Sequence, residues 1–413
     1  MSGKIDERLP RDIGEGALPN HASVKTPWDK LISLHDAANY ASRYGAVIGA
    51  ALMQALRILV PDYVERTTAM CKNAYERLTQ AFRSGIAPYS MDMLNIHPFC
   101  RGNFVGGLNG DNGDEGLLMC GRVNDFGSYR VEKELDRCDW DIIGTELCRA
   151  TVLSLQGVAD VEAEYLRPGP HLEYHMVEAK GNGELHCRIV AECRKKYPMP
   201  ETEIWKRIGP VATGDQIKFT PEEDILKEPM VFREECDYKY ISGLCTEQNA
   251  ASNVYPIVTM SNGSTYILPV IYDLIKKGKL EEKFVDHVIK CVCEASGKAA
   301  FGEFYAKEGL RDWLGAPKDM NDGRLMGAHI EMILKCLRIS YEIESFNKEE
   351  VIYVIDRNAL ANNMPKMVNA YISTWYGMTK TLVNAQWALW EEVDNTPGEK
   401  LRIKIAKRID KFS

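Results

Sequence analysis

The chain has 413 residues, of which 45% are hydrophobic and 27% charged, and its formal net charge is -8. This composition is typical of a soluble globular protein with roughly two or three domains, and it excludes collagen-like, disordered and membrane-spanning classes. Acidic and basic residues are dispersed. Since only the tail 400–411 is rich enough in lysine and arginine to follow a phosphate backbone, nucleic acid is not expected as a partner.

The cysteines and the start of the chain indicate a reducing compartment. Twelve cysteines are spaced irregularly, and residues 1–22 have neither the basic start nor the apolar core of a signal peptide. We therefore expect free thiols, a cytoplasmic location and a flexible arm over residues 1–25. The apolar stretch Tyr44–Val60 is shorter than the roughly 20 residues that cross a bilayer, so it is predicted to be a buried helix. Its small residues allow close helix contact, within the chain or across a homodimer.

A first α+β unit is predicted over residues 26–195. Its elements follow from the spacing of apolar residues and from turn-forming residues between them. In chain order they are helices over 26–82, a Gly/Asn/Asp-rich loop over 97–116, strands over 117–122 and 129–135, a helix from 142 to a stop at Gly157, and hairpin strands over 172–177 and 185–191. The hairpin turn is expected over 179–184.

The same order of elements is predicted again over residues 264–413. These elements are helices over 284–295 and 326–339, a strand over 351–358, a helix from Pro365 through Leu382, and hairpin strands over 387–393 and 401–406. The matches recur at an offset of about 216 to 220 residues, which indicates an internal duplication. The predicted fold class is therefore α+β, with two tandem copies of a helical layer plus a strand-helix-hairpin unit and a connecting insert over 196–263.

One predicted face of the first hairpin gathers ionisable side chains. If Val177 pairs with His186, the strand period of two places His171, Glu173, His175 and His186 on one face. Such residues suit a zinc or iron site or acid–base chemistry, and the alternative is a solvated sheet face. Because strand neighbours two apart project in parallel, we expect no metal cofactor, with these four residues as the fallback ligands.

A second candidate site consists of thiols around the predicted helix start. Cys138, Glu146 and Cys148 lie there. Cys187 shares with Tyr174 and Met176 the apolar hairpin face that this helix should cover. The dipole and free N–H groups of a helix start stabilise a thiolate, which would make a cysteine nucleophilic. The alternative is that these cysteines are buried as small hydrophobic residues.

The two copies differ at these positions. Asn358 corresponds to Cys138 and Ile403 to Cys187, and the histidines have no counterparts in the second copy. The first copy is therefore predicted to be the active one and the second copy to be structural.

The stretch from Asp136-Arg137-Cys138 through Glu146-Leu147-Cys148 to Gly183-Glu184-Leu185-His186-Cys187-Arg188-Ile189 resembles the L-2-amino-thiazoline-4-carboxylic acid hydrolase-like family. The resemblance covers residues 131–191. It implies an α+β unit akin to vinyl-reductase-type domains that bind small molecules, and a ring-opening hydrolase activity.

We therefore expect a hydrolase that acts on a small cyclic or conjugated organic molecule, opening a C–N or C–C bond. The catalytic candidates are Cys138, Glu146, Cys148, His175 and Cys187, and the substrate-binding candidates are His97, Arg101, Tyr174 and Met176. The competing class is a non-catalytic module that binds or senses a small molecule.

Overall fold

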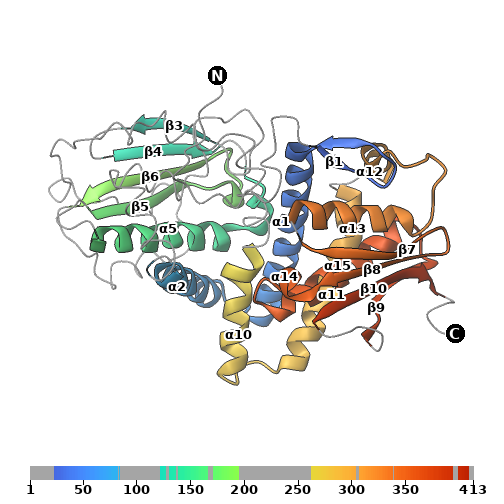
Figure 1. Cartoon of the computed structure of the whole chain (residues 1–413). Helices are drawn as coiled ribbons and strands as arrows, with labels where there is room; N and C mark the ends of the chain where they lie inside the picture. Colours follow the sequence, from blue (N-terminus) through green and yellow to red (C-terminus); the bar gives the residue numbers. More distant parts are fainter. Residues whose placement is uncertain are drawn as a thin grey trace. The chain divides into compact units, whose positions relative to one another are not determined.

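The computed structural model describes residues 23–81, 83, 121–126, 130–135, 138–165, 171–194, 262–303, 307–337, 339–393 and 399–408. The chain divides into two compact units (Figure 1). Unit 1 holds the described residues from 60 to 194, and unit 2 holds those from 23 to 59 and from 262 onward. The predicted division placed residues 26–59 in the first unit, whereas their long helix belongs to unit 2.

Unit 1 is an antiparallel sheet with two helices stacked on it. Its elements are α2 (Tyr63–Ala81), β3 (Gly121–Phe126), β4 (Arg130–Leu135), the 3-10 turn η3 (Asp141–Ile143), α5 (Thr145–Tyr165), β5 (His171–Glu178), the 3-10 turn η4 (Lys180–Asn182) and β6 (Cys187–Arg194). The strand order is β3-β4-β6-β5. Helix α5 lies along one face of this sheet, and α2 packs against α5 (Figure 1).

Unit 2 builds a similar sheet with a larger helical layer. Its elements are β1 (Ser23–Lys25), β2 (Leu31–Ser33), α1 (Leu34–Leu59), the π-helix η9 (Asn262–Ile267), α10 (Leu268–Lys276), α11 (Glu282–Glu303), α12 (Lys307–Leu314), α13 (Arg324–Leu337), β7 (Tyr341–Phe346), β8 (Glu350–Asp356), α14 (Arg357–Ala361), α15 (Pro365–Leu382), β9 (Trp387–Glu391) and β10 (Lys400–Lys407). The strand order is β7-β8-β10-β9, and α15 and α13 lie against the sheet. Helix α1 packs on α11 and α13, so its small residues serve contacts within this unit.

The α+β class is confirmed, and the structure differs from the sequence-based prediction at the end of one helix and in one additional strand. Helix α5 continues through Gly157, the predicted stop, to Tyr165. Gly157 instead lies where α2 crosses α5, because a Cβ at this position would lie 2.5 Å from Thr79 Oγ1 and 3.0 Å from the Tyr75 carbonyl oxygen. Strand β7 was not predicted, because its half-exposed residues lack the apolar run of the other strands.

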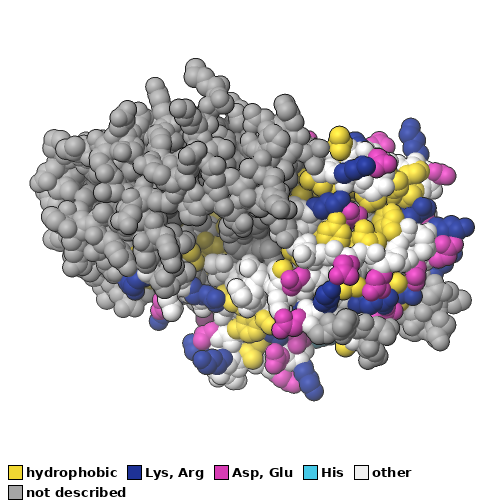
Figure 2. Space-filling model, viewed as in Figure 1, with side chains coloured by type: hydrophobic (Ala, Val, Ile, Leu, Met, Phe, Trp, Pro, Cys, Tyr) yellow, Lys and Arg dark blue, Asp and Glu magenta, His cyan; other side chains and the backbone are white. Residues whose placement is uncertain are grey.

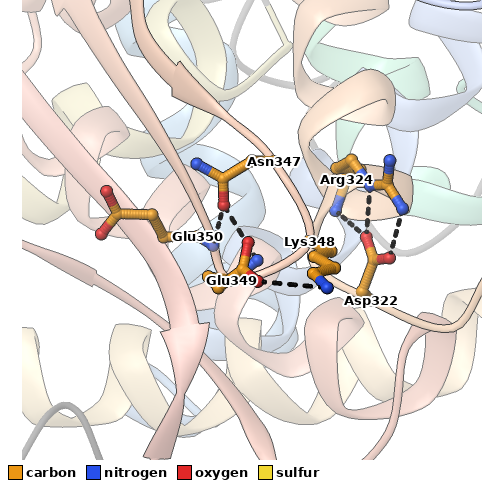
Figure 3. A network of polar contacts seen from close by, with 6 residues as sticks. All are labelled: Asp322, Arg324, Asn347, Lys348, Glu349 and Glu350. Atoms are coloured by element: carbon orange, nitrogen blue, oxygen red, sulfur yellow. Dashed lines mark hydrogen bonds and ion pairs between the residues drawn. The ribbon is translucent and has the colours of Figure 1, made fainter.

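The turn of the β7–β8 hairpin is held by one asparagine (Figure 3). The side-chain oxygen of Asn347 accepts hydrogen bonds from the backbone N–H groups of Glu349, at 2.9 Å, and Glu350, at 3.0 Å. Near this turn in Figure 3, Arg324 forms a two-pronged ion pair with Asp322 at the start of α13, at 2.7 and 2.9 Å. Asparagine is favoured at turns for this side-chain bonding.

Ion pairs shield the outer face of the unit 2 sheet. Ile352 and Val354 point away from the helices, yet they are only 5% and 6% exposed. Arg402 on β10 reaches across β8 to Glu344 on β7, and Lys404 on β10 pairs with Glu350 on the neighbouring strand β8. On the described surface in Figure 2, acidic, basic and hydrophobic side chains accordingly lie interspersed. Such mixing does not form a single-sign field that would attract a polyanion.

The two sheets agree in strand order and also in register. Each first strand has a β-bulge, between Val123 and Asp125 in unit 1 and between Ile343 and Ser345 in unit 2, at an offset of 220 residues. Bulges are specific features that re-aim a strand, so a shared bulge position is a detailed correspondence.

The helix layers correspond at the same offset. Gly377 of α15 lies 220 residues after Gly157, and a Cβ there would lie 2.1 Å from the Glu294 carbonyl oxygen of α11. Each unit therefore places a glycine where its two central helices cross. The internal duplication itself stays a prediction.

No helix in the described ranges combines the length and the apolar character needed to span a bilayer.

Candidate functional site

Three thiols from separate segments of unit 1 converge. Cys138 lies before η3, Cys148 lies in the first turns of α5, and Cys187 opens β6. The thiols of Cys138 and Cys187 lie close enough to shift each other's pKa, and the charge of Cys148 acts on Cys138. Cys187 is buried, whereas Cys138 and Cys148 are partly exposed. Three of the five predicted catalytic residues thus form one group, which we call the thiol cluster.

The thiol cluster forms where the ends of three elements meet. Leu135, the last residue of β4, pairs with Cys187, so the end of β4 lies beside the start of β6. The turn η4 packs against η3 and α5. A Cβ at Gly181 of this turn would lie 2.7 Å from Cys148 Sγ and 3.1 Å from the backbone carbon of Gly144. Glycine at 181 is therefore what lets the hairpin turn approach the thiols.

The pKa values of the three thiols are shifted in different directions. The hydrogen bond from Cys138 is the main cause that lowers the pKa of Cys187 below its usual value, although burial opposes it. The backbone N–H of Lys180, 3.3 Å from Cys187 Sγ, and the Lys180 ammonium lower this pKa further. The same hydrogen bond and burial raise the pKa of Cys138 well above its usual value. Burial raises the pKa of Cys148 to about 12.

The thiols of the cluster therefore differ in acidity. Cys187 is the more acidic, and Cys138 and Cys148 are the less acidic. A thiolate is the nucleophilic form of cysteine, so Cys187 is the reactive member. The carboxylate of Asp141 also lies close, because its charge raises the pKa of both Cys148 and Cys187.

Glu146 has a structural partner on another helix. Its Oε1 lies 2.9 Å from Nε of Arg66, and both side chains are nearly buried, at 2% and 10% exposure. Arg66 also donates to the Pro61 carbonyl oxygen at 2.6 Å. The contact ties α5 to α2, and the catalytic role of Glu146 stays a prediction.

The hairpin register differs from the predicted one by two residues. His175 pairs with Val190 and Met176 with Ile189, whereas the prediction paired Val177 with His186. A β-bulge near Val177 and the turn η4 absorb the extra residues. Because a shift of two preserves the strand period, the predicted residues of β5 keep their faces.

The face that carries His175 is buried, so its interpretation as a solvated face is wrong. Glu173, His175 and Glu192 are 3%, 3% and 6% exposed. Nε2 of His175 lies 3.3 Å from Oε2 of Glu192, a residue that the predicted register did not place there. His186 lies outside the strands, with its Nδ1 3.7 Å from Oε1 of Glu134.

Metal binding at this face gains no support from the geometry. Among the described residues, no three His, Cys, Asp or Glu side chains are placed to hold a metal ion together. The side chain of His171, one of the fallback ligands, lies outside the described residues. The expectation of no metal cofactor stays a prediction.

The sheet itself separates His175 from the thiol cluster. Cys187 and Ile189 share one face of β6, whereas Val190, the partner of His175, points to the other. His175 therefore cannot exchange a proton with a substrate held at Cys187. Tyr174 and Met176 share the face of Cys187, as a substrate-binding role would require.

Two predicted residues cannot be compared with the structure, and three residues of the site were not predicted. His97 and Arg101 lie outside the described residues. Sequence reasoning missed Asp141, Lys180 and Gly181 as parts of the site. The Lys-Gly-Asn-Gly turn was the available signal, since a glycine-rich turn permits a close backbone approach.

The second unit lacks the thiols. With Ile355 opposite Leu401, as Leu135 is opposite Cys187, the counterpart of Cys187 is Leu401 and not Ile403 as predicted. Val368 takes the place of Cys148, and both replacements are buried apolar residues. At the position of Cys138, the Asn358 side chain donates to Glu399 at 2.6 Å.

Comparison with known proteins gives no match: no protein-family model, no curated protein and no solved structure matches the chain. The resemblance of residues 131–191 to the amino-thiazoline-carboxylate hydrolase-like family stays a prediction.

Proposed function

We propose that unit 1 is a cysteine-dependent hydrolase of a small cyclic organic molecule, with Cys187 as its nucleophile. The observation that carries this proposal is the environment of Cys187. The backbone N–H of Lys180 lies 3.3 Å from its Sγ, and the neighbouring Cys138 thiol and the Lys180 ammonium lower the pKa of this buried sulfur. Structural cysteines in the same chain have the opposite property, because burial raises the pKa of Cys71 and Cys293 to about 12.

The first half of the reaction is a nucleophilic ring opening. The Cys187 thiolate attacks a ring carbon bonded to nitrogen, a C–S bond forms, and the ring C–N bond breaks. The released nitrogen takes a proton from the neighbouring Cys138 thiol, whose pKa is raised well above its usual value. This assigns the acid role to Cys138 and removes it from His175, which is on the opposite face of the sheet.

Hydrolysis of the covalent intermediate completes the cycle. Water adds to the carbon bonded to Cys187, the C–S bond breaks, and one proton of the water returns to the cluster, so that the net change is addition of one water to the substrate. Asp141 is the carboxylate available to take the proton from this water, since its charge acts on Cys187 and Cys148. Tyr174 and Met176 offer an aromatic ring and a thioether on the nucleophile's face of the sheet.

The test is turnover of a defined panel by the full chain. The panel contains 2-amino-thiazoline carboxylates, cyclic amidines and lactams, and mass spectrometry detects a product heavier by one water. We expect Cys187→Ser to abolish product formation, whereas Cys71→Ser, which changes a buried thiol of α2, retains it. Intact-mass analysis under acid quench should show an adduct on the wild-type chain.

A different pattern would favour the competing class. If panel compounds bind, their affinity falls on Tyr174→Ala and Met176→Ala, and no compound is converted, unit 1 is a binding module. If a compound is converted at an equal rate by the Cys187→Ser variant, the nucleophile assignment is wrong. Circular dichroism of each variant shows that a loss of turnover is not a loss of folding.

A further inference from the structure

The outer face of α11 in unit 2 carries a cysteine and a histidine one helical turn apart. Cys291 and His287 are both exposed, and Sγ of Cys291 lies 3.7 Å from Nε2 of His287. Residues four apart are neighbours on a helix surface, so the helix itself holds these two side chains together. Cys293, two residues further along, is fully buried. Cys291 is therefore the accessible thiol of α11.

The distance between the two side chains matches the spacing of ligands around a zinc ion. Zinc forms bonds of about 2.3 Å to a cysteine sulfur and about 2.05 Å to a histidine nitrogen, so in a tetrahedral site these two atoms lie about 3.6 Å apart. The observed distance between Cys291 Sγ and His287 Nε2 is 3.7 Å. Both atoms can therefore bind one ion without a change in the helix backbone.

We propose that Cys291 and His287 bind an exchangeable zinc ion on the surface of α11. Thiolate sulfur and imidazole nitrogen are ligands that zinc prefers, whereas magnesium and calcium prefer oxygen. On binding, the Cys291 thiol releases its proton to solvent, and neutral His287 offers the lone pair of Nε2 while Nδ1 keeps its proton. This ion would be separate from the proposed hydrolase activity, which belongs to unit 1.

The surroundings of the pair explain why the ion would be exchangeable. Glu294, three residues after Cys291, is the next carboxylate along this side of α11. Its Oε1 is already held by Lys380 at 2.6 Å and by Lys298 at 3.2 Å. Within the described ranges, no three His, Cys, Asp or Glu side chains are placed to hold a metal ion together. Two positions of the tetrahedron are therefore left for water, unlike in a closed structural site.

The experiment measures how zinc changes the reactivity of one cysteine. The full chain is reduced, freed of metal and treated with iodoacetamide with and without low-micromolar zinc, and peptide mapping by mass spectrometry gives the alkylation rate of Cys291. We expect zinc to slow this alkylation, because the ion occupies the sulfur that iodoacetamide attacks. Magnesium at the same concentration should leave the rate unchanged.

Two exposed substitutions on α11 identify the second ligand. His287→Gln should abolish most of the protection of Cys291 by zinc. Lys290→Gln is the matched control, because it changes an exposed side chain beside the pair without removing a ligand, and it should keep the protection. Exposed substitutions such as these have little effect on folding. Since the rate is read at Cys291 alone, zinc bound by other cysteines of the chain does not contribute to it.

Three results would overturn the inference. These are an alkylation rate of Cys291 that zinc leaves unchanged in the wild type, equal protection in His287→Gln and the wild type, or equal protection by magnesium and zinc. The measurement needs no turnover, so a chain that binds zinc here but hydrolyses nothing would contradict only the proposed function. A hydrolase whose Cys291 is not protected would contradict only the zinc site.

Discussion

Exchanging the charges of the ion pair between α2 and α5 tests the internal repeat by energetics. In unit 1, Arg66 on α2 pairs with Glu146 on α5 at 2.9 Å. In unit 2, 220 residues later, Asp286 on α11 pairs with Lys366 on α15 at 2.6 Å. The two pairs occupy corresponding positions with reversed charges. If the units are copies of one architecture, Arg66→Asp combined with Glu146→Lys should produce the unit 2 arrangement inside unit 1.

The single substitutions should be costly. Glu146 is 2% and Arg66 10% exposed, and removing one partner of a buried pair costs roughly 3–5 kcal/mol. Because Arg66 keeps the Pro61 carbonyl oxygen as an acceptor, we expect Glu146→Ala to lie near the lower limit, about 3 kcal/mol. Glu146→Lys should cost more, since it places two cations together.

The double exchange should recover most of this loss. In unit 2, Glu282 is a second partner of Lys366 at 3.2 Å, and Asp62 occupies the matching position in unit 1. We therefore expect a coupling energy of up to about 3 kcal/mol between the two substitutions.

Urea unfolding followed by circular dichroism measures the effect for the wild type, both single variants and the double variant. Exchanging the exposed pair Lys72 and Glu76, which are 55% and 58% exposed, is the control and should change stability by less than about 1 kcal/mol. If the double variant is as unstable as the sum of the two single variants, the positions are not equivalent and the argument from the repeat fails.

Three further outcomes are expected. Lys180→Met removes a cation that lowers the pKa of Cys187. Iodoacetamide should therefore alkylate Cys187 more slowly at pH 7, and the pH dependence of the alkylation rate should move to higher pH. An unchanged pH dependence would exclude a role for the Lys180 ammonium. Gly377→Ala places a Cβ 2.1 Å from the Glu294 carbonyl oxygen and should destabilise the chain by roughly 1–3 kcal/mol in urea unfolding, whereas no loss would show that the helices separate freely. Burial lowers the pKa of His329 to about 3, so the unfolded chain binds a proton that the folded chain does not. The free energy of unfolding should then fall by up to about 5 kcal/mol as the pH drops from about 6.5 toward 3. In urea titrations, His329→Gln should flatten this pH dependence. An equal slope in the wild type and the variant would contradict the prediction.

The sequence by itself determined the class and the order of elements. The period of two along residues 172–177 and the helical period along residues 365–382 are local properties of the chain, so they predict a hairpin strand and a helix without knowledge of their partners. The predicted faces of β5 are correct despite an error of two residues in register, because an even shift preserves the alternation of side chains between the two faces. For the same reason, Tyr174 and Cys187 were correctly placed on one face.

Only the tertiary structure decided which residues act together. Glu146 pairs with Arg66, 80 positions earlier, and Gly157 continues a helix because another helix crosses there. Helix α1 joins the far end of the chain, although it precedes α2 directly in sequence. The state of Cys187 depends on a thiol and a turn brought together by strand pairing. Ion pairs, helix crossings and pKa shifts depend on distances between segments remote in sequence, and these distances exist only once the sheet and its helices have packed.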